Sequence, residues 1–354
     1  MLDEHKKILS VFKFKRVIIP IIFGLGVASI LLFRSFDKEV FQNIHWVWYS
    51  YLWLLCALAL MAVRDIAYMY RIRLLTDKQL SWRRSFQVIM LWEFASSVTP
   101  SVVGGSAVAL FIVNKEGINM GRTTAIVMIT ALLDEMFYIL MAPVIFILVG
   151  YKNLFVSDAE FALFNTKFGT LGIFLIGYVF ILILTSIIIY GVFINPRGFK
   201  WILIKIFKLP LLRRWLYKAA ETGDQIITTS KEMKGKPFVF WLKAYGATLF
   251  SWTARYWVVN CMILAFLSVH EHFLIYARQL VMWVILLISP TPGGSGVAEF
   301  VFSDFLGEFI TPGLAPALAL LWRLLSFYPY LFIGAIILPG WLRRVYSKKN
   351  IHQV

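Results

Sequence analysis

Six long apolar segments dominate this sequence and limit the folds that it can adopt. A helix that crosses the hydrocarbon core of a bilayer needs about 20 mostly apolar residues. Of the 354 residues, 60% are hydrophobic and 15% are charged, whereas roughly a quarter of a soluble chain is charged. The usual soluble enzyme folds are therefore excluded. The predicted membrane-spanning helices are residues 17–33, 46–63, 123–149, 169–193, 238–268 and 314–339.

Two further apolar stretches are interrupted near their middle by proline and glycine. Residues 85–113 contain Thr99-Pro100 and Gly104-Gly105, and residues 274–309 contain Pro290-Thr291-Pro292-Gly293-Gly294. Cytoplasmic loops carry an excess of Lys and Arg, so the basic residues indicate on which side each loop lies. If both stretches return to the side from which they entered, 25 of the 35 basic residues fall on one side, in segments 1–16, 64–84, 195–237 and 340–354.

This charge distribution favours two re-entrant helical hairpins. The loops on the other side, 34–45, 150–168 and 269–273, together carry only four basic residues. If the first broken stretch spanned the membrane instead, the ten basic residues of 195–237 would lie outside, against the positive-inside rule. We therefore expect a multi-pass protein of the cell (inner) membrane with both termini in the cytoplasm.

A sequence repeat relates the two hairpins. Gly104-Gly105-Ser106-x-Val108-Ala109-x-Phe111 recurs 189 residues later as Gly293-Gly294-Ser295-x-Val297-Ala298-x-Phe300, with six identities in eight positions. Three predicted spans separate the hairpins, which then enter from opposite sides. Inverted repeats with broken helices are typical of transporters. The sequence predicts an all-α polytopic membrane protein with two repeats, 1–168 and an inverted 169–354; the alternative is that both breaks are simple helix kinks.

The glycine pairs are candidate binding elements. Glycine lets the chain reverse and lets another group approach the backbone closely, and the unpaired N–H groups of a following helix start attract an anion such as phosphate. The predicted substrate-binding residues of the hairpins are accordingly Gly104, Gly105, Ser106, Gly293, Gly294 and Ser295.

Charged residues inside apolar segments form the second group of candidates. A charge at mid-bilayer costs about 2.5–3.5 kcal/mol even on a lenient scale, so these residues should face one another or a wet cavity. The 189-residue offset aligns Asp134 with Arg323, which suggests either a substrate or gating role or an ion pair that locks the halves together. The candidates are Glu93, Asp134, Glu135, Arg255, Glu299 and Arg323.

Other sequence signals narrow the partners. No phosphate-binding loop, zinc pattern or nucleophile elbow occurs, so we expect no metal and no cofactor. In a membrane protein, a net charge is interpreted by where the basic residues lie along the chain. The net charge of +16 therefore favours membrane lipids with anionic or phosphate headgroups as partners over nucleic acid. Cys56 and Cys261 lie in apolar runs, so no disulfide framework is predicted. The sequence leaves open whether the chain forms a homo-oligomer.

The basic segment 195–237 can be interpreted in two ways. Its first part mixes tryptophan, phenylalanine and isoleucine with lysine and arginine, a composition that suits an interfacial helix on an anionic leaflet. An ordinary basic cytoplasmic loop is the alternative.

The hairpin motifs resemble a known family. The segment from Pro290 to Glu299 followed by Trp322-Arg323, together with Thr99-Pro100, Gly104-Gly105 and Leu133-Asp134-Glu135, is similar to the lysylphosphatidylglycerol synthase transmembrane, or flippase-like, family over nearly the whole chain. The resemblance implies transport without synthesis, because well-understood members such as the multiple peptide resistance factor move aminoacylated phospholipids to the outer leaflet and this chain shows no synthase domain. Glu135 departs from the family pattern, in which an arginine is common at this position.

Two functional hypotheses follow. The first is a lipid flippase or scramblase in which a polar headgroup, of a phospholipid or a lipid-linked sugar, crosses through a cavity between the repeats. The second is an integral membrane enzyme or accessory subunit acting on a lipid or polyprenyl phosphate, with Asp134, Glu135 or Glu299 as general base. The only nearby hydroxyls are those of Thr130 and Tyr138, without metal ligands beside them, so transport is favoured.

Overall fold

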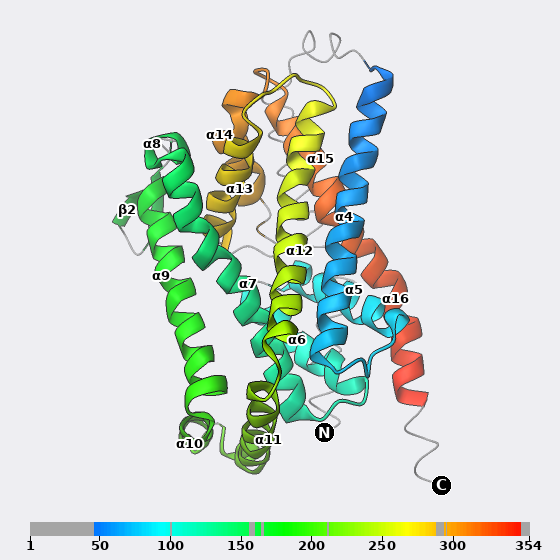
Figure 1. The fold of residues 1–354 in the computed structure, drawn as a ribbon, viewed down its shortest axis with the longest axis vertical. Coiled ribbons are helices and arrows are strands. Elements are labelled where there is room, and N and C mark those ends of the chain that lie inside the picture. The colour runs from blue at the N-terminus through cyan, green and yellow to red at the C-terminus, as the bar shows by residue number, and fades with distance from the viewer. Residues whose placement is uncertain are drawn as a thin grey trace.

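The computed structural model describes residues 46–99, 101–155, 160–163, 166–210, 212–287, 294 and 296–347, and within them the fold is almost entirely helical (Figure 1). The predicted span 17–33, Gly293 and Ser295 lie outside the described residues, as do the side-chain surroundings of Gly104. The helices are α4 (Trp48–Leu75), α5 (Trp82–Val98), α6 (Ser101–Lys115), α7 (Met120–Val149), α8 (Tyr151–Leu154), α9 (Thr170–Ile188), α10 (Pro196–Phe207), α11 (Leu216–Lys234), α12 (Phe238–Leu264), α13 (His272–Leu287), α14 (Val297–Leu306), α15 (Ala315–Ser326) and α16 (Tyr328–Ser347).

Short elements complete the fold. A π-helical turn, η2 (Ile189–Ile194), extends α9, and two 3-10 turns are η3 (Arg213–Trp215) and η5 (Gly307–Phe309). Strands β1 (Glu160–Leu163) and β2 (Thr166–Gly169) pair antiparallel, with Glu160 opposite Gly169.

Four helical stretches in the described part of the chain are long and apolar enough to cross a membrane. They are α4, α7, α9 with η2 as far as Ile194, and α15–α16 from Ala315 to Tyr346. They correspond to the predicted spans 46–63, 123–149, 169–193 and 314–339. The predicted span 238–268 corresponds to the 27-residue helix α12. This helix carries Lys243 and Arg255, and it is not one of the four candidate membrane spans. A helical, multi-pass membrane fold is thus confirmed.

Helix α4 extends further than the sequence predicted. It ends at Leu75 rather than at residue 63, because the two arginines that lower the hydropathy of its second half are neutralised inside the protein. Arg64 is 1% exposed and Arg71 is 4% exposed. Counting both among the basic residues of a cytoplasmic segment, 64–84, was therefore wrong.

The two broken stretches form helical hairpins. Helices α5 and α6 pack against each other on either side of the first break, and α13 and α14 do so on either side of the second. Figure 1 shows α13 and α14 in the upper half of the molecule and α5 and α6 in the lower half. A Cβ atom at Gly105 would lie 3.0 Å from the Cα atom of Ser96, so the predicted close backbone approach is confirmed at this glycine.

Longer helices surround the hairpins. Helices α4 and α12 form the most extensive pair and lie side by side along the molecule (Figure 1). Helix α16 packs on α5, where a Cβ atom at Gly334 would lie 2.4 Å from the Cβ atom of Phe94. Helix α11 packs on α7. The hairpins are therefore enclosed by helices from both halves of the chain.

Candidate functional site

A cavity of about 270 Å³ lies between the two hairpins. Side chains from α4, α5, α6, α7, α12, α13, α14, α15 and α16 line it, and its volume is ample for several water molecules or a polar headgroup. Seven predicted site residues line this cavity: Glu93, Ser106, Asp134, Glu135, Arg255, Gly294 and Arg323. The sequence therefore predicted which charges meet, although it did not predict how they pair.

Arg64 is the most heavily bonded side chain of the cavity wall. Its Nη2 atom donates to Glu93 at 2.7 Å, and its Nη1 atom donates to Asp65 at 2.8 Å and to the Tyr330 hydroxyl at 2.7 Å. The Tyr330 hydroxyl in turn donates to Asp65 at 2.9 Å. The guanidinium also lies over the ring of Tyr68, 4.7 Å from its centroid. Arg64 thus joins α4 to α5 of the first hairpin and to α16 near the C-terminal end.

Arg71 lies two turns after Arg64 on the same face of α4 and holds Asp134. Its two terminal nitrogens lie 2.6 and 3.0 Å from the two carboxylate oxygens, a bidentate geometry that is the strongest form of this pair. Trp252 of α12 donates to the same carboxylate at 2.8 Å, and Arg71 also donates to Thr248 at 2.7 Å. Asp134 is therefore fixed by α4 and α12 together.

Arg323 pairs with Glu299 and not with Asp134. The two side chains lie 3.1 Å apart and are both almost fully buried. Glu299 also accepts the N–H of Gly296 at 2.7 Å, which ties the start of α14 to α15, and the Arg323 guanidinium lies 3.6 Å from the ring centroid of Phe327. The alternative in which Asp134 and Arg323 form a direct ion pair is wrong, because each has a nearer partner of opposite charge, although both line the same cavity.

Two cavity charges have no such partner. Among the described residues, Arg255 makes no ion pair; its guanidinium lies over the ring of Trp283 at 4.2 Å and over that of Trp252 at 5.4 Å. Glu135 is 7% exposed, and its Oε2 atom finds no hydrogen-bond partner within the described part of the chain. A buried charge is normally paired, so these two groups distinguish the cavity from a purely structural ion-pair network.

Comparison with known proteins identifies the family. Residues 17–334 match the family model for the lysylphosphatidylglycerol synthase TM region. The chain belongs to this family. A relative described as a UPF0104 membrane protein, from Archaeoglobus fulgidus, is 27% identical over 337 residues, which cover 90% of this chain and 94% of the relative. No solved structure gives a significant match. The predicted family resemblance is confirmed, and with it the membrane assignment.

Several residues that line the cavity were not predicted from the sequence. Arg64 and Arg71 were placed beyond the end of a span, and the partners Tyr330 and Trp252 were not considered. The available signal was spacing: residues seven apart lie on one face of a helix, two turns from each other. Arg64 and Arg71 have this spacing directly after an apolar run, which is the pattern of a helix that continues along a polar interior.

Two predicted residues, Gly105 and Glu299, contribute differently from expectation, whereas Gly294 lines the cavity as predicted. Gly105 packs against Ser96 inside the first hairpin, so its backbone serves helix packing. Glu299 is buried behind the cavity surface and caps the start of α14. Gly294 lines the cavity with a positive φ of 67°, a conformation that favours glycine. Chemically, the site offers one guanidinium without an ion pair and one carboxyl oxygen without a hydrogen bond, as far as the described residues extend, together with an aromatic wall.

Proposed function

We propose that this protein is a flippase or scramblase-like lipid transporter that passes a polar headgroup, of a phospholipid or a lipid-linked sugar, between leaflets through the cavity. The observation that carries this proposal is that Arg255 makes no ion pair with any described residue, in a cavity whose other arginines are neutralised. An arginine over an aromatic face is suited to bind a phosphate, because the guanidinium fork matches phosphate oxygens. The lipid tails would remain in the surrounding bilayer.

Glu135 complements this arginine. Its carboxyl group can accept a hydrogen bond from an amine or a hydroxyl of the headgroup, while Arg255 binds the phosphate. Because Glu135 stands at a position where the family commonly has an arginine, we propose that it sets which headgroups this member accepts. Ser106 and Gly294 contribute hairpin surface to the same cavity.

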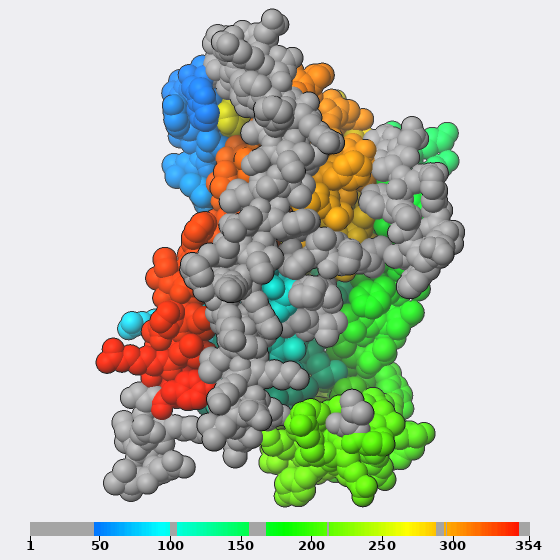
Figure 2. Space-filling view, turned by 180° about the vertical axis from the view of Figure 1, so that it is seen from behind, coloured from blue at the N-terminus to red at the C-terminus, as the bar shows by residue number. Residues whose placement is uncertain are grey.

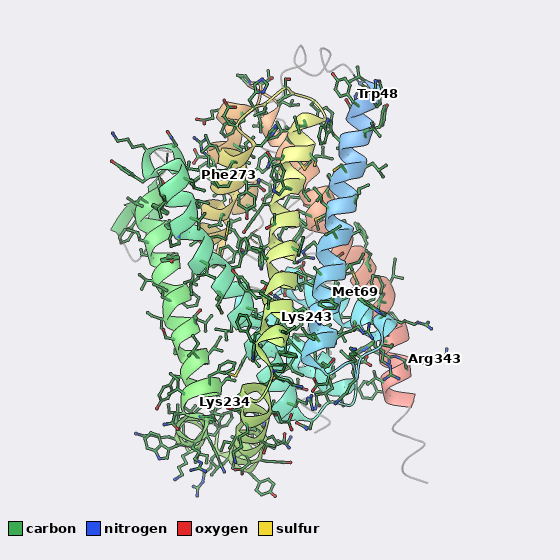
Figure 3. All side chains as sticks on the ribbon, viewed as in Figure 1. Trp48, Met69, Lys234, Lys243, Phe273 and Arg343 are labelled. Carbon is green, nitrogen blue, oxygen red and sulfur yellow. The ribbon has the colours of Figure 1, made fainter. Side chains whose placement is uncertain are left out.

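The inverted repeat is the second part of the proposal. We infer that residues 1–168 and 169–354 are two repeats of opposite orientation, each with one re-entrant hairpin. Two observations support this: the hairpins occupy opposite halves of the molecule (Figure 1), and Lys234 and Arg343 lie at the lower end, whereas Trp48 and Phe273 lie toward the upper end (Figure 3). The lower end would then face the cytoplasm.

Cysteine labelling tests this orientation. In a background with Cys56→Ser and Cys261→Ser, we expect a cysteine at Lys152 to react with an impermeant maleimide added to intact cells. Cysteines at Lys78 and Lys231 should react only after the membrane is permeabilised. The opposite labelling pattern would overturn the proposed topology.

An enzyme on a lipid phosphate is less well supported by the geometry. Two of the three candidate general bases are engaged, Asp134 with Arg71 and Trp252 and Glu299 with Arg323. A base that must take up a proton is poorly served by a bidentate arginine, which stabilises its ionised form. Transport therefore remains the function that the cavity supports best.

A transport assay in proteoliposomes tests the function. Fluorescent lipids with different headgroups are placed in both leaflets, and the fraction that dithionite bleaches from outside reports translocation. We expect the wild-type protein to move at least one headgroup class and Arg255→Gln to lose most of that activity. Lys243→Gln, which removes an exposed charge from the same helix, is the matched control and should keep it.

Folding of the Arg255 variant is checked separately. Because Arg255 makes no ion pair among the described residues, its loss costs only its contacts with two tryptophan rings, about 0.5–2 kcal/mol. Arg255→Gln should therefore purify as a monodisperse protein. A folded Arg255→Gln protein that transports every tested headgroup at the wild-type rate would refute the assignment of Arg255.

A further inference from the structure

Helix α10 begins where the chain leaves a membrane-spanning helix. The π-helical turn η2 ends α9, and Ser230 of α11 donates to the Val192 carbonyl of that turn. The Asn195 side chain accepts the N–H of Gly198 at 2.8 Å, and Pro196 occupies the first turn. These are strong helix-start signals. The direction of α10 relative to α9 is therefore fixed by specific contacts.

One face of α10 is committed to the protein. It packs on η2 and on α11, with the Phe199 ring against Gly191. Lys200 lies against Gly223 and forms an ion pair with Asp224 at 2.6 Å. Even with these contacts, no side chain of α10 is fully buried.

Apolar side chains in α10 and in the turn after it are nevertheless exposed. Trp201 is 61% exposed and Ile206 is 45% exposed, and Ile202 and Leu209 are exposed as well. Ile202 and Ile206 lie one turn apart on one side of α10, and Leu209 follows in the turn after the helix ends at Phe207. Trp201 lies beside this aliphatic row. Such a row on a water-facing surface would be costly, so it calls for an apolar partner.

Uncompensated positive charge borders the apolar row. Lys205 lies over the Trp201 ring, 4.9 Å from its centroid, and Arg214 lies over Trp215 at 3.9 Å. Within the described residues, neither of these two nor Lys208 nor Arg213 makes an ion pair, and all four are exposed. The segment lies at the lower end of the molecule. In Figure 2 it is the green to yellow-green region at the bottom.

We propose that the exposed side chains of α10 and of the turn after it, Trp201, Ile202, Lys205, Ile206, Lys208 and Leu209, dock on the anionic lipids of the adjacent leaflet. The aliphatic row would enter the boundary of the acyl chains, the tryptophan would lie at headgroup depth, and the lysines would contact lipid phosphates. This lipid surface is distinct from the cavity, since α10 contributes no residue to the cavity lining. A leaflet fits better than a protein partner because α9 and η2, which precede this surface in the chain, expose apolar side chains as far as Ile194, and because the basic side chains beside the surface match anionic lipid headgroups.

Spin labels measure this docking directly. In the Cys56→Ser, Cys261→Ser background, a nitroxide is attached at Ile206→Cys, and the matched control is Lys231→Cys on the exposed surface of α11. The protein is reconstituted into vesicles of phosphatidylcholine with or without phosphatidylglycerol. Collision with oxygen reports acyl surroundings, and collision with a water-soluble nickel chelate reports water.

We expect the label at position 206 to collide mainly with oxygen in anionic vesicles and several-fold more with nickel in neutral vesicles. Lys205→Gln with Lys208→Gln should reproduce the neutral-vesicle result in anionic vesicles, while the label at position 231 should report water throughout. Nickel access at position 206 in anionic vesicles would overturn the proposal. So would protection from both reagents together with spin coupling between copies, which would show a second protein on this face.

The readout is independent of transport. Arg255→Gln should keep the oxygen accessibility of position 206, because Arg255 lies in the cavity. Failure of lipid transport and failure of α10 docking are therefore distinguishable outcomes.

Discussion

The ion pair between Arg323 and Glu299 makes the sharpest test of how the cavity is built. Both side chains are almost fully buried and 3.1 Å apart. Removing one partner of a buried pair leaves the other charge without compensation, at a cost of about 3–5 kcal/mol. Removing both charges avoids that penalty, so the double variant should be much less destabilised than the sum of the single variants.

The variants follow from the local contacts. Arg323→Met keeps an unbranched apolar side chain beside the Phe327 ring. Glu299→Gln keeps an oxygen that can accept the N–H of Gly296. We expect each single variant to lose about 3–5 kcal/mol, and the double variant to show an interaction energy of at least about 2 kcal/mol, within the range seen for contacting residues.

Thermal unfolding in detergent, followed by the loss of the monodisperse protein, measures these differences. At roughly 2–4 °C per kcal/mol, each single variant should melt roughly 6–20 °C below the wild type. The comparison cycle pairs Arg323→Met with Asp134→Asn and should be additive within about 0.5 kcal/mol, because Asp134 is held by Arg71. A larger coupling of Arg323 to Asp134 than to Glu299 would refute the assignment of ion pairs.

Three further predictions concern other contacts. Tyr330→Phe removes the hydroxyl that bridges the buried ion pair of α4 and should cost about 1–3 kcal/mol in thermal unfolding, whereas Tyr217→Phe, at an exposed side chain, should cost nothing measurable. Partial burial acts to raise the pKa of Asp77, but neighbouring lysine and arginine side chains outweigh it and hold this pKa below its usual 3.8. The carboxylate therefore contributes to the free energy of unfolding above pH 4, and this contribution is lost as the pH falls through the lowered pKa. In unfolding measured across pH, Asp77→Asn should be less stable than the wild type at neutral pH and should lose less stability below pH 4. Gly105→Ala should cost about 1–3 kcal/mol by overpacking the hairpin, while Gly246→Ala, whose Cβ would meet nothing within 4 Å, should match or exceed the melting temperature of the wild type.

Much of the architecture could be predicted from the pattern of apolar residues and breaks. Pro100 and the glycines after it mark the end of α5 and the close packing of α6, because proline disfavours helix in the residue before it and glycine permits close approach. The cost of a charge in the bilayer also predicted correctly that Asp134, Glu135, Arg255 and Arg323 share a cavity. These inferences use local rules that tertiary contacts do not override.

The pairing of the charges could not be predicted in this way. The repeat offset aligned Asp134 with Arg323, but alignment between repeats does not specify contact. The actual partner, Arg71, lies on a part of α4 that hydropathy excludes from a span, because an arginine is scored as if it were exposed to lipid. The carboxylate that α7 brings to Arg71 stabilises this guanidinium inside the protein.

The four arginines of the cavity therefore differ in what their loss would show. Arg64, Arg71 and Arg323 each neutralise a carboxylate of another element, so removing any of them leaves a buried or half-buried carboxylate without its arginine and destabilises the fold. Lost transport in such a variant would report lost structure as readily as a lost binding site. Arg255 rests against tryptophan rings without a carboxylate among the described residues. It is the position at which a change in activity can be separated from a change in stability, and the headgroup preference of Arg255 variants is the measurement that bears most directly on the cargo.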